Sequence, residues 1–324
     1  MKFIDLPDHI QERAVNHSVV KGMRRRPRVY ADTRDFTTID YGDIILVDGR
    51  FFLIIAYTRE GRFGVDDQPK QWVPKVVDLE NGVTHIVKLV FHETFEVRLG
   101  TFNITCYRSP EKEARILEMV QGNMRFMQGY GAEDEAGNLV RILDVIRGQR
   151  LDKYIHRFDM DHEEYFQTIF PNLLGEFLEC VKGIGIIHAN GMRHGDIRRD
   201  HIFVEYDTGL FRWIDFDYDF YLPERPFALD LFELGSILMY LMGRGNFYPS
   251  NVQKHPAMGD KVLNTITADD ISLLSKNRIV NLKKLFPYIP KSLNDICMHF
   301  AISTPVFYDS VNELSDDIEN YLIG

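Results

Sequence analysis

The order of hydrophobic and polar positions divides the chain into a part rich in strands and a part rich in helices. Between about residues 40 and 95, β-branched and aromatic runs flank the pairs Asp48-Gly49 and Asn81-Gly82, and such pairs are typical of antiparallel hairpins. A further apolar run at 139–146 predicts another strand. An antiparallel sheet is therefore expected in the first half of the chain.

A helix is predicted to follow the second hairpin. Ser109 is a typical N-cap, Pro110 suits the first helical position, and Ala114, Leu117 and Val120 recur at helical spacing. Beyond about residue 147 the same spacing recurs in "FLECVKGIGIIHANG", "FALDLFELGSILMYLMG", "LNDICMHFA" and "SVNELSDDIENYL". The expected fold class is α+β.

This change of pattern places the expected domain boundaries. Residues 1–39 are expected to form an N-terminal extension, residues 40–146 a lobe with an antiparallel β-sheet, and residues 147–324 a mainly helical lobe. A chain of 324 residues is long enough for each lobe to bury a core of its own.

Composition narrows the class of protein. A net charge of −10 argues against a nucleic-acid surface, and the short basic run "KGMRRRPRVY" is expected to be a solvated face, with a docking or phosphate-reading arm as the alternative. No apolar run approaches the roughly 20 residues of a membrane span. The first residues include acids where a signal peptide has a basic end and an apolar stretch, so a cytoplasmic protein is expected. The three cysteines lack C-x-x-C spacing and are expected to be thiols in the core.

One stretch, "RHGDIRRDHIFVEYDTGLFRWIDFD", combines two strands with two carboxylates. A turn at Asp207 to Gly209 joins the strands, so Asp196 and Asp215 are expected at neighbouring ends of one hairpin. Phosphoryl transfer uses such a pair, because one carboxylate orients an acceptor hydroxyl and another holds the Mg²⁺ that bridges the phosphates.

These motifs resemble those of the protein-kinase-like superfamily, and bacterial Ser/Thr protein kinases in particular. "HGDIRRDH", residues 194–201, is similar to the catalytic loop H-R-D-L-x-x-x-N, and "DFD", residues 215–217, is similar to D-F-G. "IVKLV" resembles the V-A-I-K strand, and "DLFELGSILMYLM" resembles the helix whose first residue, here Asp230, anchors the catalytic loop. The resemblance implies a bilobal protein-kinase-like fold that binds ATP and Mg²⁺ between an N-lobe and a C-lobe.

The resemblance also implies the role of each matching residue. Asp196 would be the catalytic base, Lys88 would contact the α- and β-phosphates, and Glu113 would hold Lys88. Asp215 would bind Mg²⁺, with help from Asp217 or His201. The adenine would meet backbone groups of the predicted hinge and two flanking side chains; these positions are Asp144, Ile146, Ile86 and Phe203.

The sequence departs from the family pattern at four places besides Asp217, which stands where D-F-G has its glycine. Only Gly61 and Gly64 represent the glycine-rich loop, and His201 stands where the family has a metal-binding asparagine, although Mg²⁺ prefers oxygen. Gly195 replaces the arginine that reads a phosphate on the activation loop, so control by such phosphorylation is not expected. The segment between Asp215 and Asp230 leaves little room for an activation loop and a peptide platform.

The expected function is therefore transfer of the γ-phosphoryl group of ATP to a hydroxyl, with Ser/Thr of a protein as the first choice of acceptor. A kinase for a small molecule, such as a sugar or an antibiotic, is an alternative that explains the short segment. A pseudokinase that acts as a binding or scaffold module is another, since it explains His201 and the poor glycine loop. Nucleic acid is not an expected partner, and no membrane span is expected in the chain.

Overall fold

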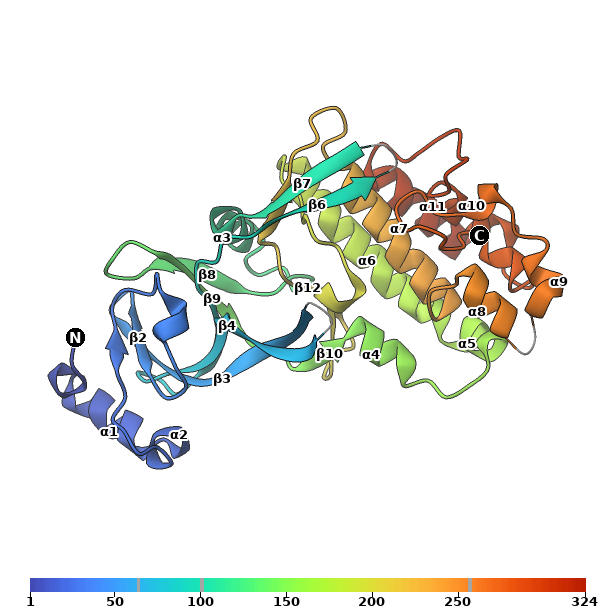
Figure 1. The fold of residues 1–324 in the computed structure, drawn as a ribbon. Helices are drawn as coiled ribbons and strands as arrows, with labels where there is room; N and C mark the ends of the chain where they lie inside the picture. Colours follow the sequence, from blue (N-terminus) through green and yellow to red (C-terminus); the bar gives the residue numbers. More distant parts are fainter. Residues whose placement is uncertain (63–64, 100–101, 256–257) are drawn as a thin grey trace. The chain divides into compact units, whose positions relative to one another are not determined.

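The computed structural model describes residues 1–62, 65–99, 102–255 and 258–324 (Figure 1). The chain forms two compact units. The first contains Met1–Glu93 and Arg108–Ile146, and the second contains Thr94–Tyr107 and Arg147–Gly324. The second unit therefore takes in a short segment from the first half of the chain.

The first unit is built on a sheet whose described part has seven strands in the order β1-β2-β3-β4-β5-β9-β8. All neighbours are antiparallel except β1 and β2. A bridge between Val47 and Asp134 brings the end of β8 back to β2. The strands are β1 (Val29–Tyr30), β2 (Ile44–Val47), β3 (Arg50–Arg62), β4 (Val65–Asp78), β5 (Thr84–Lys88), β8 (Gly129–Glu133) and β9 (Leu139–Asp144).

Both predicted hairpins are confirmed. Asp48 and Gly49 have positive φ angles of 49° and 70° and join β2 to β3, as a two-residue turn between right-handed strands requires. Gly82, with φ 78°, lies in the longer turn between β4 and β5. The predicted strand 139–146 is present as β9.

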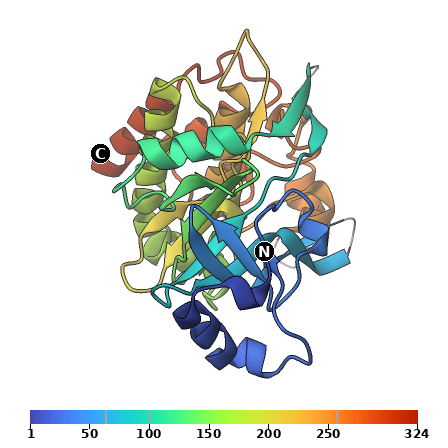
Figure 2. The same ribbon diagram turned by 90° about the vertical axis from the view of Figure 1, so that its left-hand side faces the viewer.

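Strand alternation gives this sheet two apolar faces. In β2, Ile45 and Val47 belong to one buried cluster, while Ile44 and Leu46 belong to another. The second cluster is completed by the N-terminal segment, whose Ile10 is fully buried. This segment consists of η1 (Phe3–Asp5), α1 (Asp8–Asn16) and α2 (Ser18–Lys21), drawn in dark blue in Figure 2. It therefore covers one face of the sheet.

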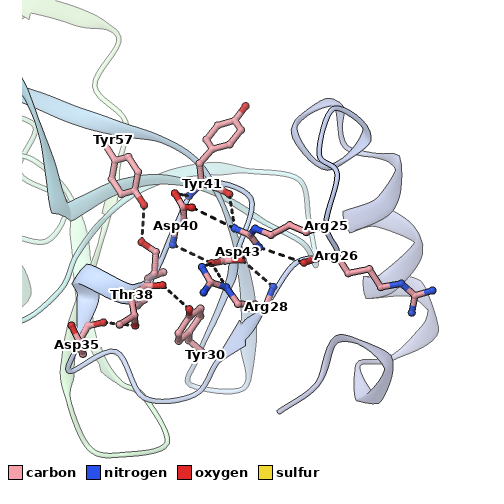
Figure 3. A network of polar contacts seen from close by, with 11 residues as sticks. Arg25, Arg26, Arg28, Tyr30, Asp35, Thr38, Asp40, Tyr41, Asp43 and Tyr57 are labelled. Atoms are coloured by element: carbon pink, nitrogen blue, oxygen red, sulfur yellow. Dashed lines mark hydrogen bonds and ion pairs between the residues drawn. The ribbon is translucent and has the colours of Figure 1, made fainter.

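A buried carboxylate fastens the basic run to the sheet (Figure 3). Asp43 is fully buried and accepts hydrogen bonds from the guanidinium groups of Arg25 and Arg28. The backbone N–H groups of Arg28 and Asp40 also donate to it, at 3.0 and 3.1 Å. Part of the basic run thus has a structural role, because it neutralises a buried charge.

The predicted helix is also confirmed as α3 (Pro110–Met119), which belongs to the first unit. The Ser109 hydroxyl caps it by accepting from the Lys112 amide at 3.3 Å. Its buried face includes Glu113, Ile116 and Leu117. A carboxylate on the buried face of a helix needs a partner, and the site below supplies one.

The second unit is mainly helical, and its long helices α6 and α7 lie side by side (Figure 1). Its helices are α4 (Leu151–His156), α5 (His162–Thr168), α6 (Phe170–Ala189), α7 (Ala228–Gly243), α8 (Pro249–Lys254), α9 (Gly259–Leu263), α10 (Lys291–Met298) and α11 (Val311–Ile323). All four predicted helical segments are present as α6, α7, α10 and α11. The α+β class is therefore confirmed.

Two three-stranded sheets complete the second unit in its described part. One contains β10 (Gly148–Arg150), β11 (Ile202–Glu205) and β12 (Phe211–Trp213); the other contains β13 (Tyr218–Phe220), β7 (Phe102–Arg108) and β6 (Thr94–Leu99). The predicted hairpin around residues 207–209 is confirmed as β11–β12. The β6–β7 hairpin is not among the predicted elements, and it explains why residues 94–107 belong to the second unit.

Two smaller expectations are also settled. Cys106, Cys180 and Cys297 are buried thiols, as predicted. None of the helices in the described ranges combines the length and apolar character that crossing a membrane requires. The division into an extension and two lobes at 39 and 146 stays a prediction.

We expect Asp43→Ala to lower the free energy of unfolding by about 2 to 3 kcal/mol, because two arginines and two backbone amides lose their common acceptor. Urea unfolding followed by circular dichroism measures this. The control is Asp35→Ala, since Asp35 is exposed, and it should change stability by less than about 0.5 kcal/mol. Equal stability of the two variants would contradict the structural role of Asp43.

Candidate active site

A buried ion pair in the first unit joins β5 to α3. The Nζ of Lys88, at the end of β5, lies 2.7 Å from Oε1 of Glu113. Arg141 in β9 donates its Nε to Oε2 of the same carboxylate at 3.2 Å. All three side chains are at most 4% exposed, so a strand lysine, a helix glutamate and a second strand cation are locked together.

Arg141 was missed by the sequence analysis. Its signal was present, because a single arginine interrupts the apolar strand "LVRILD" and a buried cation requires an acidic partner. The sequence could not show which acid it meets, since Arg141 is far from Glu113 along the chain. The Glu113 carboxylate thus meets a cation from β5 and another from β9.

The other predicted nucleotide contacts in the first unit are less enclosed. Ile86 is half-buried against the sheet cluster, and Ile146 is half-buried at the end of the unit. The exposed carboxylate of Asp144 lies 3.5 Å from Nδ1 of His85. Gly61 lies in β3, and Gly64 is outside the described residues.

In the second unit, Asp230 at the start of α7 holds the "HGD" loop. Its fully buried carboxylate accepts from the backbone amides of His194 at 2.8 Å and Gly195 at 3.0 Å. Nε2 of His188 lies 3.0 Å away. Burial alone would raise the pKa of Asp230, but the hydrogen bond and charge of His188, the charge of His194 and the Gly195 amide keep it lowered. The loop backbone is thereby fixed to a helix.

Gly195 is required by the geometry of that loop. Its φ is +85°, and a Cβ at this position would lie 1.9 Å from the carbonyl oxygen of Tyr218. No side chain fits there without moving the backbone. Glycine is therefore required at this position, because the segment after Asp217 runs directly against the loop.

His201 lies between the two carboxylates of the hairpin. Its Nδ1 is 2.8 Å from the carbonyl oxygen of Asp196 and 3.4 Å from Oδ2 of the same residue, while its Nε2 is 3.4 Å from Oδ2 of Asp215. The ring is 8% exposed. The residue at the family's asparagine position therefore faces both predicted functional aspartates.

Local charges also set the protonation of Asp196. Burial raises the pKa of its carboxyl group, and the charge of Asp215 adds to this, whereas His201 and Arg198 act in the opposite direction. A carboxyl group with a raised pKa accepts a proton more readily than an ordinary aspartate. This is the property that a base toward a hydroxyl group needs.

Glu233, one turn along α7 from Asp230, is a further acid that the sequence analysis missed. Its Oε2 accepts the Ile197 amide at 2.8 Å. Burial, together with the charges of Asp196 and Asp230, raises its pKa well above the usual range. The helical periodicity of α7 gave no sign of this role, because the residue lies in an apolar run.

The positions after the hairpin differ in exposure. Asp215 has a positive φ of 70° and its side chain is 21% exposed, whereas Asp217 is 1% exposed. Phe203 is half-buried in β11, opposite Arg150 of β10. Asp215 is thus the accessible carboxylate of the predicted metal set.

Mg²⁺ is usually bound by one or two protein carboxylates together with substrate phosphates and water. Across the described ranges no group of three or more His, Cys, Asp and Glu residues is arranged to hold a metal ion. The partly exposed oxygens of Asp215 fit the smaller protein share that Mg²⁺ with a nucleotide needs. His201 is a poorer donor for this hard cation.

No family model matches the chain. Among solved structures, the kinase domain of Mycobacterium tuberculosis PknI is 12% identical with a TM-score of 0.48, covering 83% of this chain and 95% of its own. Rad53 residues 1–466, in complex with AMP-PNP, is 15% identical with a TM-score of 0.49, covering 84% of this chain and 65% of its own.

The protein-kinase-like fold follows from the architecture of the chain itself. One unit has an antiparallel sheet whose strand lysine pairs with a helix glutamate. The other is mainly helical and holds its "HGD" loop on the first turn of a long helix. The predicted fold is confirmed on these grounds, while the predicted roles of the site residues stay predictions.

We expect Gly195→Ala to destabilise the protein by about 3 kcal/mol, because the new Cβ overlaps the Tyr218 carbonyl and φ is unfavourable. The control is Gly191→Ala, where φ is +70° but no atom lies within 4 Å of the new Cβ. That change should cost only about 1 kcal/mol. Urea unfolding of both variants tests the expectation, and equal losses would refute the close contact.

Proposed function

We propose that the protein is an ATP-dependent phosphotransferase that transfers the γ-phosphoryl group to a hydroxyl. The observation that carries the proposal is the pair Asp196 and Asp215, held at the two ends of one hairpin with the His201 ring within 3.4 Å of both carboxylates. A scaffold has no chemical use for two carboxylates kept this close, since like charges repel each other.

The first unit supports the same proposal. The buried Glu113 carboxylate holds Lys88 at 2.7 Å and also meets Arg141, so the lysine ammonium has a fixed place. In the proposed function Lys88 would contact the α- and β-phosphates of ATP. Ile86 in the first unit and Phe203 in the second are each half-buried and apolar, so each keeps its proposed role as a contact of the purine base.

The proposed reaction is a single phosphoryl transfer that protein side chains assist. The acceptor hydroxyl oxygen forms a bond to the γ-phosphorus, the bond from that phosphorus to the β,γ-bridging oxygen breaks, and ADP leaves with the bonding electrons. Asp196 orients the hydroxyl and takes its proton. Asp215 would hold Mg²⁺, which supplies charge neutralisation at the phosphates when bound.

His201 orients the site in this proposal. Its imidazole reaches Asp196 through one nitrogen and Asp215 through the other, so it fixes the position of both carboxylates. Most of the rate would come from such positioning and from charge stabilisation. Asp217, at 1% exposed, is the less accessible of the two carboxylates that would help to hold the ion.

The acceptor and the cellular location are finer parts of the proposal. The helices of the second unit favour the predicted Ser/Thr hydroxyl of a protein, whereas the short segment between Asp215 and Asp230 favours a small molecule. The cytoplasm supplies ATP and keeps the buried thiols reduced, and we place the protein there.

We expect calorimetric titration to show ATP binding that depends on Mg²⁺. Asp215→Asn should weaken this binding about tenfold or more, because one charged ligand of the ion is lost. The control is Asp207→Asn, whose carboxylate is 69% exposed at the hairpin turn, and it should bind ATP like the wild type. No binding, or binding indifferent to Mg²⁺ and to Asp215, would sink the proposed function.

We expect Asp196→Asn to lower the rate of ADP formation by about a hundredfold or more while leaving ATP affinity within about twofold, because Asp196 acts on the acceptor and not on the nucleotide. Turnover with water as the acceptor provides the assay, with Asp207→Asn again as the control. A variant as active as the wild type would remove Asp196 from the mechanism.

A further inference from the structure

A cavity of about 530 Å³ lies within the second unit, beside the catalytic loop. Its wall includes residues 197–200 of that loop, one side of α7, and the segments 246–248 and 274–278. We call it the arginine pocket, because Arg150, Arg198, Arg199 and Arg278 all line it. Nothing in the proposed handling of ATP uses these four side chains.

Two of the four arginines have a carboxylate of their own. Arg150 donates to Asp152 through Nε at 3.1 Å and Nη2 at 2.9 Å. Arg198 donates to Asp200 in the same bidentate way, at 3.1 and 2.7 Å. These two pairs are internally neutral.

The other two arginines have no such partner. Within the described ranges neither Arg199 nor Arg278 forms an ion pair with a carboxylate. The Arg199 guanidinium lies 5.0 Å from the ring centre of Tyr240. Arg278 is 4% exposed and donates Nη2 to the Ser236 carbonyl at 2.7 Å.

Arg278 is an unusual group on physical grounds. Burial lowers its pKa to about 10, and the nearby charge of Arg199 acts in the same direction. It is still charged near neutral pH. A buried cation without a carboxylate is costly, and a bound anion would remove that cost while also relieving the repulsion between the two arginines.

The wall of the pocket also contains unsatisfied polar atoms. Oγ of Ser236 and Oδ1 of Asn246 are buried and have no hydrogen-bond partner within the described residues. Buried polar groups are nearly always hydrogen-bonded. The Ser236 hydroxyl can donate to an oxygen, and the Asn246 amide can do so after a flip of its side chain. The Ser236 hydroxyl therefore points to an oxygen atom of a ligand, whereas Asn246 would do so only in the flipped orientation.

The acids of the wall do not cancel this charge. Asp152 and Asp200 are engaged with Arg150 and Arg198, and Glu233 accepts the Ile197 amide. Arg199 and Arg278 therefore meet no carboxylate among the described residues. Arginine forks match the oxygen geometry of a phosphate group.

We propose that the arginine pocket binds the phosphate group of a small phosphorylated acceptor, whose hydroxyl then faces Asp196. The proposal rests on the proposed function and names its substrate class. Its link to the base is Arg198, whose Nη1 lies 3.9 Å from Oδ2 of Asp196. The Ile197 amide, which donates to Glu233, joins the pocket wall to the same loop.

A small acceptor fits the dimensions of the pocket better than a polypeptide does. Its volume lies in the range of about 300 to 1,000 Å³ that small ligands occupy. The buried Arg278 is reached only by a group that enters the pocket. The short segment between Asp215 and Asp230 leaves little surface on which to lay a peptide.

The first test is calorimetric titration of the full chain with inorganic phosphate. We expect binding that Arg199→Gln and Arg278→Gln each weaken about tenfold or more, since each removes a charge-assisted hydrogen bond. Arg225→Gln is the matched control, because Arg225 is exposed and pairs with Asp309. Arg199 is also exposed, so its variant stays informative if Arg278→Gln fails to fold.

The second test uses glycerol and glycerol 3-phosphate as competitors of inorganic phosphate. Displacement by glycerol 3-phosphate and not by glycerol supports the proposal. A site that takes inorganic phosphate but excludes glycerol 3-phosphate, or that prefers a phosphoserine peptide, overturns the small acceptor. Absence of phosphate binding, or binding indifferent to Arg199 and Arg278, overturns the site itself.

Failure of the anion site and failure of the proposed function give different results. Asp215 does not line the pocket, so Asp215→Asn should bind inorganic phosphate like the wild type. If the protein binds phosphate in the pocket but does not bind ATP, the anion site is supported and the proposed phosphotransferase function is refuted.

Discussion

The burial of one carboxylate, Asp230, determines the shape of the candidate site. An aspartate with no exposed surface is stable as an ion only if several donors meet it, and here two successive backbone amides and His188 do so. Because the amides belong to His194 and Gly195, the residue that follows them can take only a narrow range of positions. The location of Asp196 is thus a consequence of satisfying a charge inside α7.

The acids around the "HGD" loop lie close together, and hydrogen-bond donors and the His201 ring contact them. Burial and the charges of Asp196 and Asp230 raise the pKa of Glu233, whereas the donors around Asp230 keep the pKa of that carboxyl group lowered. His201 supplies a ring that contacts both hairpin aspartates. An amide at this position would provide an oxygen for a metal, whereas the imidazole brings one ring nitrogen toward each of the two acids. Replacing the family's asparagine therefore changes how the carboxylates are kept together.

Local patterns in the sequence predicted the parts of the fold that depend on local physics. The Asp48-Gly49 turn, the Ser109-capped helix and the apolar spacing of α7 follow from residues that are near one another in the chain. The pairing of β7 with β13 does not. Strands that are far apart along the chain pair through side-chain packing and register, which the hydrophobic periodicity of each strand does not encode. The same reason hid Arg141 and Arg278, whose partners come from distant segments.

Gly195 of the "HGD" loop shows how a local residue choice depends on a contact with a later segment of the chain. In the family that the sequence resembles, an arginine at this position reads a phosphate on the activation loop. Here the Tyr218 carbonyl occupies the space of any side chain at Gly195, since the short segment after Asp217 returns directly as β13. No side chain can therefore extend from this position, and the arginines that meet no carboxylate among the described residues, Arg199 and Arg278, line the pocket beside the catalytic loop. In the proposed mechanism, positive charge that serves regulation in those kinases serves recognition of the acceptor.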